Sequence, residues 1–81
     1  MIFHRLKNIT PLEDKILLAE FQDGTTKHYD VKPLKEKITA FEMLDYVQGL
    51  FEQVRIDAGG YGIIWNDELD LSCNEIYNNG Y

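Results

Sequence analysis

The sequence predicts an α+β fold: a small antiparallel sheet of two hairpins with one face covered by two short helices. Two observations predict the hairpins. Gly59 and Gly60 separate two alternating runs, and Asp23 with Gly24 separates two runs rich in β-branched and aromatic residues. A third predicts the helices, because helix-capping patterns precede two apolar stretches. With 81 residues, we expect one α+β domain over residues 1–81.

The first 31 residues predict a turn and then a hairpin. Pro11 and the acidic residues after it mark the turn, and a short edge strand fits before it. The hairpin has two possible registers. A two-residue loop at Asp23 and Gly24 would pair Leu18 with Tyr29.

A three-residue loop over residues 22–24, with Gly24 left-handed, is the alternative that we favour. It keeps the large apolar side chains on one face, namely Leu17, Ala19, Phe21, Tyr29 and Val31. It leaves on the outer face Glu20, Thr26, His28 and Asp30.

Residues 33–51 predict a connector and the first helix. Pro33 ends the strand, and residues 34–37 have room for one helical turn. Thr39 followed by Glu42 has the form of a capping box. Apolar residues then recur at spacings of three and four, at Phe41, Leu44, Val47, Leu50 and Phe51. Gly49 weakens this helix and is the expected place for a break.

The second hairpin has the most definite geometry. Two glycines suit a type I′ turn, which needs positive φ at both central residues. Counting outward pairs Ile56 with Ile63 and Arg55 with Ile64. The core face then holds Val54, Ile56, Ala58, Tyr61, Ile63 and Trp65, and the outer face Arg55, Asp57, Gly62 and Ile64.

The end of the chain predicts a polar turn at residues 66–68 and a second helix. Ser72 and Glu75 repeat the capping-box pattern. The helix should run over residues 73–78, and Gly80 is positioned to end it.

Composition excludes several classes of protein. The formal charge of −6 argues against binding of nucleic acid or of an anionic membrane surface. No apolar run approaches the roughly 20 residues that span a bilayer. Cys73 is the single cysteine and cannot form an internal disulfide, and the amino terminus has no apolar signal segment. These features favour the cytoplasm.

Few side chains suggest chemistry. His28 and Asp30 share a strand face, Asp67, Glu68 and Asp70 follow the last strand, and Cys73 lies near a helix start. The acids lack the spacing of a calcium loop, and His4, His28 and Cys73 match no zinc pattern. We therefore predict no catalytic, cofactor or metal site. The alternative is a ligand-binding protein or enzyme that uses His28, Asp30 and the turn from Asp67 to Asp70.

Gly62 on the outer face suggests an interface. The turn does not require this glycine, and a strand glycine can mark the close approach of another backbone. The candidate interface therefore comprises Gly62, Ile64, Arg55 and Asp57.

Five segments, in order along almost the whole chain, resemble the family of small bacterial proteins known as domain of unknown function 2442. They are residues 21–24, 29–34, 51–54 and 60–65, and residues 69–71 together with Ile76 and Tyr77. The resemblance implies two hairpins with short helices and no recognised catalytic residues. Members occur alone or fused ahead of a helix-turn-helix domain, and are suspected of acting beside a small partner in toxin and antitoxin pairs. This sequence stops at Tyr81, so we do not expect it to bind DNA on its own.

We therefore expect a non-catalytic protein-interaction module, antitoxin-like or regulatory, whose partner is a small cognate protein. A basic partner suits the acidic chain, because complementary charge raises the rate of association.

Overall fold

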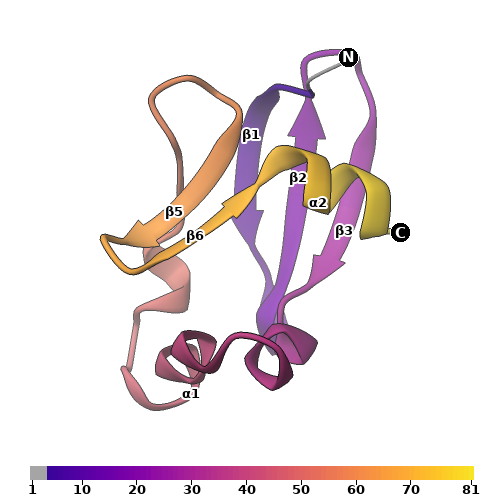
Figure 1. Ribbon diagram of the computed structural model, residues 1–81. Coiled ribbons are helices and arrows are strands. Elements are labelled where there is room, and N and C mark those ends of the chain that lie inside the picture. Colours follow the sequence, from indigo (N-terminus) through magenta and orange to yellow (C-terminus); the bar gives the residue numbers. More distant parts are fainter. Residues whose placement is uncertain (1–3) are drawn as a thin grey trace.

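A computed structural model describes residues 4–81 and confirms the α+β class. It contains two three-stranded antiparallel sheets (Figure 1). The first comprises β1 (Leu6–Pro11), β2 (Ile16–Phe21) and β3 (Thr26–Asp30), and the second β4 (Arg55–Ile56), β5 (Gly62–Asn66) and β6 (Leu69–Ser72). The α-helices are α1 (Met43–Tyr46) and α2 (Cys73–Asn79). Short 3-10 helices are η1 (Glu13–Lys15), η2 (Lys32–Glu36), η3 (Thr39–Glu42) and η4 (Phe51–Gln53).

Each predicted hairpin gains a third strand. The two hairpins do not pair with each other, so there are two sheets where the sequence predicted one. β1 is the edge strand that fitted before the first turn, and it ends at Pro11, whose missing N–H suits an edge. β6 was not predicted. The Asn66 side chain accepts hydrogen bonds from the N–H groups of Glu68 and Leu69, at 2.8 and 3.0 Å. This tight turn sends the chain back along β5.

The favoured register of the first hairpin is confirmed. Leu17 lies opposite Tyr29, and Gly24 has φ of +91° in the three-residue loop. The pairing of Leu18 with Tyr29 is therefore wrong. Leu17, Ala19, Phe21 and Tyr29 are all buried on one face. On the other face Thr26 is exposed, while Glu20, His28 and Asp30 are half-buried.

The register of the second hairpin is confirmed, but the type I′ turn is wrong. Ile56 pairs with Ile63, as predicted. The N–H of Gly60 donates to the carbonyl of Asp57 at 2.9 Å, and of the two adjacent glycines only Gly60 has positive φ, at +79°. The loop spans residues 58–61, because the N–H of Asp57 donates to the carbonyl of Gly62.

The longer loop changes which residues reach the core. Ile63 and Trp65 are buried as predicted, with 0% and 1% of their surface exposed. Tyr61 is 51% exposed and Ala58 is also exposed, so placing both on the core face was wrong. Both residues belong to the loop and not to a strand.

The predicted first helix is broken into η3, α1 and η4. Ile38 and not Thr39 occupies the N-cap position of η3, and no side chain caps it, so the capping box was wrong. α1 ends at Tyr46, and Gly49 turns the chain with φ of +82°. Val47, at the break, is 40% exposed. The other four residues of the predicted stripe are buried, namely Phe41, Leu44, Leu50 and Phe51.

The second helix is confirmed as α2. The Ser72 hydroxyl accepts a hydrogen bond from the N–H of Glu75 at 3.1 Å, and the helix stops at Gly80. A side chain at position 80 would lie 2.6 Å from the carbonyl oxygen of Ile76 and 2.8 Å from that of His28. Gly80 therefore allows the chain after α2 to approach β3 closely.

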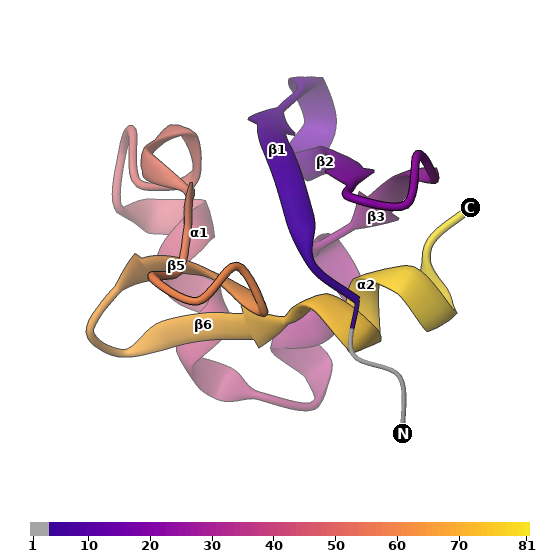
Figure 2. The ribbon, with the colours of Figure 1, turned by 90° about the horizontal axis from the view of Figure 1, so that it is seen from above.

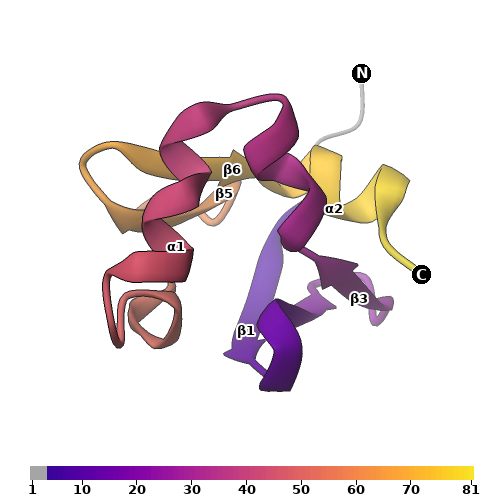
Figure 3. The same ribbon diagram turned by 90° about the horizontal axis from the view of Figure 1, so that it is seen from below.

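The core lies between the sheets and the helical segments. Figure 3 shows the helical segment between β3 and β4 running from the first sheet to the second, and Figure 2 shows α2 leaving β6 toward the first sheet. Trp65 packs edge-on against Phe41, with ring centroids 5.7 Å apart, and its Nε1 donates to the carbonyl of Phe51 at 3.2 Å. A backbone hydrogen bond of 2.9 Å from Leu6 to Gly60 links the two sheets. Within residues 4–81, no helix is long and apolar enough to cross a membrane.

Candidate functional site

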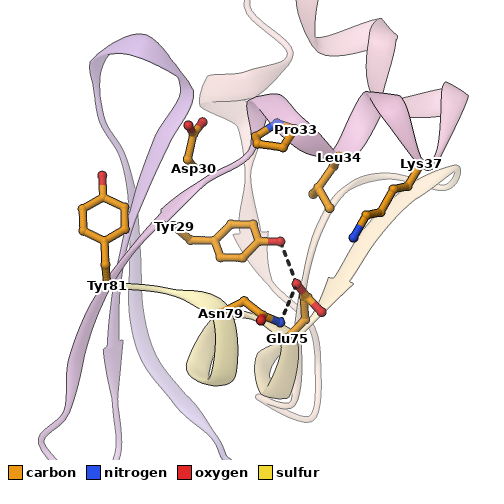
Figure 4. Close-up of a pocket in the computed structure, with 8 residues that line it drawn as sticks. All are labelled: Tyr29, Asp30, Pro33, Leu34, Lys37, Glu75, Asn79 and Tyr81. Atoms are coloured by element: carbon orange, nitrogen blue, oxygen red, sulfur yellow. Dashed lines mark hydrogen bonds between the residues drawn. The ribbon is translucent and has the colours of Figure 1, made fainter.

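A pocket of about 350 Å³ lies between β3, η2 and α2 (Figure 4). One wall is polar. The hydroxyl of Tyr29 and the amide nitrogen of Asn79 both donate to Oε2 of Glu75, each at 2.9 Å. Glu75 and Asn79 are four residues apart in α2 and therefore lie on the same face of the helix. Tyr29 comes from the first sheet, so the cluster fastens α2 to β3.

Burial, followed by the hydrogen bond to Glu75, raises the pKa of Tyr29 above its ordinary value. Tyr29 therefore stays a neutral hydroxyl that donates to the Glu75 carboxylate. Both of these hydrogen bonds use Oε2, and among the described residues Oε1 of Glu75 accepts none. The carboxylate is thus held in place with one oxygen available to the pocket.

The opposite wall comes from η2 and the residue after it. Pro33 and Leu34 supply apolar surface, and Lys37 supplies an ammonium group. Neighbouring lysines form ion pairs. Nζ of Lys32 lies 2.9 Å from Oδ1 of Asp30, and Nζ of Lys35 lies 2.8 Å from Oδ2 of Asp45. Within residues 4–81, Lys37 forms no ion pair or side-chain hydrogen bond. Its charge is thus available to the pocket.

His28 and Asp30 share β3 but do not form an acid–base pair. The backbone N–H and carbonyl of His28 both bond to Tyr81 at 2.8 Å, and the two rings stack with centroids 5.6 Å apart. Asp30 is partly desolvated, which raises its pKa, but hydrogen bonds from Lys32 outweigh this and hold the pKa below its usual range. Asp30 lines the pocket of Figure 4, and His28 does not.

The structure does not bring the four residues of the alternative site together. Asp67 lies in the turn between β5 and β6 and Asp70 lies in β6, both in the second sheet. Figure 1 shows this turn on the opposite side of the molecule from β3, which carries His28 and Asp30. Within residues 4–81, no group of three His, Cys, Asp or Glu side chains is placed to hold a metal ion.

A second hollow, of about 250 Å³, lies over β5 and β6 and is called here the acidic hollow. It is lined by Asp57, Tyr61, Gly62, Ile63, Asp70, Leu71 and Ser72. It therefore joins two residues of the candidate interface, Asp57 and Gly62, to Asp70. The other two, Arg55 and Ile64, form a cross-strand pair between β4 and β5 outside the hollow.

Gly62 lies against a backbone of its own sheet, where we expected the backbone of a partner. A Cβ at this position would lie 3.0 Å from the carbonyl oxygen of Leu71. The backbone that approaches Gly62 is therefore the chain's own β6, and the glycine is explained by internal packing.

The acidic hollow adjoins an open sheet edge. β6 pairs only with β5 among the described strands, so its other side is free to accept a further strand. Within residues 4–81, neither Asp57 nor Asp70 forms an ion pair. The open edge of β6 thus lies beside a hollow on the sheet face that carries two unneutralised carboxylates, Asp70 in β6 and Asp57 directly after β4.

Cys73 is packed and not activated. It is completely buried, and its Sγ donates to the carbonyl of Gly60 at 3.4 Å. Burial raises the pKa of the thiol to about 11. Burial dominates the pKa of this thiol, so its place near a helix start does not make it reactive.

We expect Cys73 to resist alkylation in the folded protein. The thiolate is the reactive form, and at pH 8 a group with a pKa of about 11 is almost entirely protonated. Because the folded state holds this proton more tightly than the unfolded state, stability should fall as pH rises from about 9 toward 11. Mass spectrometry after iodoacetamide treatment, with and without urea, checks the first expectation. Rapid modification without urea would contradict it.

The cluster of Tyr29, Glu75 and Asn79 was not predicted from the sequence. Glu75 was assigned only to the helix cap, and the available signal was the four-residue spacing of Glu75 and Asn79. Nothing in the sequence indicated that Tyr29 and Lys37 would lie against them.

Neither the curated proteins nor the solved structures contain a match to the chain. A family model described as "protein of unknown function (DUF2442)" matches residues 6–81, which include every strand and helix described above. The chain therefore belongs to the DUF2442 family.

Proposed function

We propose that this chain is a protein-interaction module, antitoxin-like or regulatory, that binds a small basic cognate protein along the edge of β6. The observation that carries this proposal is the open edge of β6 beside the acidic hollow. An extended segment of a partner adds to such an edge through main-chain hydrogen bonds, and side-chain pockets beside it supply specificity.

The electrostatics favour a basic partner. The chain carries a formal charge of −6, and the carboxylates of Asp57 and Asp70 form no ion pair among the described residues. A lysine or arginine side chain entering the acidic hollow would neutralise them. The half-exposed ring of Tyr61 lines the same hollow, and the guanidinium group of Arg5 lies 5.4 Å from its centroid.

The test is a charge-reversed pair of variants. Tagged protein at native levels should recover one small basic protein in stoichiometric amount, and the purified pair should be studied by calorimetry. Asp57→Lys with Asp70→Lys should weaken the complex by at least about tenfold, or about 1.4 kcal/mol.

A matched control changes the same amount of charge elsewhere. Glu13→Lys with Glu36→Lys alters two exposed acids in η1 and η2, away from the second sheet. This variant should retain the partner. If no partner is recovered, or if both double variants bind equally well, the proposal is wrong.

A further inference from the structure

Opposite charges line the pocket of Figure 4 without pairing with each other. Figure 4 shows the ammonium of Lys37 directed toward the side of the pocket that carries Glu75. No ion pair joins these two residues, and neither has another charged partner within residues 4–81. A ligand that carries both a cation and an anion would satisfy both groups at once.

A further charged side chain of the pocket, Asp30, is already neutralised. Asp30 accepts hydrogen bonds from the backbone and side chain of Lys32, at 3.0 and 2.9 Å. Among the lining side chains, the charges left for a ligand are therefore one carboxylate and one ammonium group, Glu75 and Lys37. A purely cationic ligand would meet Lys37, and a purely anionic ligand would meet Glu75.

The remaining lining indicates a small ligand with an apolar part. Pro33 and Leu34 form the apolar wall. The volume of about 350 Å³ lies at the lower end of the roughly 300–1,000 Å³ that ligand pockets occupy.

We propose that this pocket binds a free α-amino acid with an apolar side chain. The α-ammonium group donates to Oε1 of Glu75 and to the carbonyl oxygen of the Asn79 side chain. The α-carboxylate accepts from Lys37, and the side chain lies against Leu34 and Pro33. This site lies on the first sheet and is separate from the acidic hollow, so it goes beyond the proposed function.

The Glu75 carboxylate is held in place before any ligand arrives. The hydrogen bonds that it accepts from Tyr29 and Asn79 hold it against β3, and the N-cap bond from the Glu75 N–H to the Ser72 hydroxyl fixes the start of α2. A group that is already ordered loses less entropy when it binds, so a small ligand gains more affinity from it.

Three related ligands test the proposal on the intact chain. In an NMR titration, leucine should bind saturably with a dissociation constant on the order of 1 mM and shift the signals of Tyr29, Leu34, Lys37 and Glu75. N-acetyl-leucine lacks the ammonium group and leucinamide lacks the carboxylate, so each should bind at least about tenfold more weakly. Absence of saturable shifts with leucine, or equal binding of leucinamide, would overturn the proposal.

Variants test the two charges separately. Lys37→Ala and Glu75→Gln should each weaken leucine binding by at least about tenfold, and circular dichroism should show that both remain folded. Glu75→Gln keeps an oxygen that accepts from Tyr29. Lys7→Ala removes an exposed lysine of β1, outside the pocket, and should leave binding unchanged. Equal loss in all three variants, or loss in none, would exclude this site.

Discussion

Replacing Trp65 with alanine is expected to lower the free energy of unfolding by about 3–5 kcal/mol. Trp65 is 1% exposed, packs against Phe41 and donates a hydrogen bond to the carbonyl of Phe51. The substitution therefore removes a large buried surface and leaves the Phe51 carbonyl with only the longer hydrogen bond from the Val54 N–H, at 3.4 Å. A domain of 81 residues is expected to have a stability of only about 5 kcal/mol, so much of the variant should be unfolded.

Urea denaturation followed by circular dichroism measures this effect, because the signal does not depend on the indole that is removed. Trp65→Phe keeps most of the apolar contact and should cost less than the alanine variant. Tyr46→Ala is the surface control, since Tyr46 is 71% exposed, and it should change stability by less than about 0.5 kcal/mol. A Trp65→Ala protein that melts cooperatively near the normal midpoint would show that the core does not depend on this residue.

Strand registers were predictable because two local signals agree. In the first hairpin, the loop with Gly24 left-handed also gathers Leu17 and Phe21 on the buried face. In the second hairpin, the alternation of inward and outward side chains placed Ile63 and Trp65 on the same face, which is buried. The helix α2 was predictable for a similar reason, because Ser72 caps its start and Gly80 follows its end.

Features that depend on distant contacts were not predictable. β6 follows β5 directly because the Asn66 side chain closes a tight turn. In the sequence, a polar residue in that position indicates only a loop. The broken helix follows from packing, since Leu50 and Phe51 reach the core from η4 only after the chain has turned at Gly49.

The pocket of Figure 4 was hidden for the same reason. Tyr29 and Lys37 are far in sequence from Glu75 and Asn79, and only the packing of α2 on the first sheet brings them together. Alternation placed Tyr29 in the core, which is correct for its ring. It gave no indication that the hydroxyl would reach a carboxylate.

The two adjacent glycines in the turn between β4 and β5 look equivalent in the sequence but differ in conformation. Gly60 has φ of +79°, whereas Gly59 does not have positive φ. Gly60→Ala should therefore cost about 1–2 kcal/mol, the penalty for an L-residue in the left-handed region. The carbonyl of Gly60 accepts from the N–H of Leu6 and from Sγ of Cys73, so strain here also loosens the link between the sheets.

Gly59→Ala is the matched control. A Cβ there would meet only the ring of Tyr61, at 3.2 Å, and this ring is half exposed and able to shift. Reduced freedom of the unfolded chain then favours alanine, so stability should stay unchanged or rise by up to about 1 kcal/mol. Urea midpoints of the two variants measure the difference. A type I′ turn would destabilise both variants alike. Equal losses of stability would therefore indicate a type I′ turn, with Tyr61 on the core face.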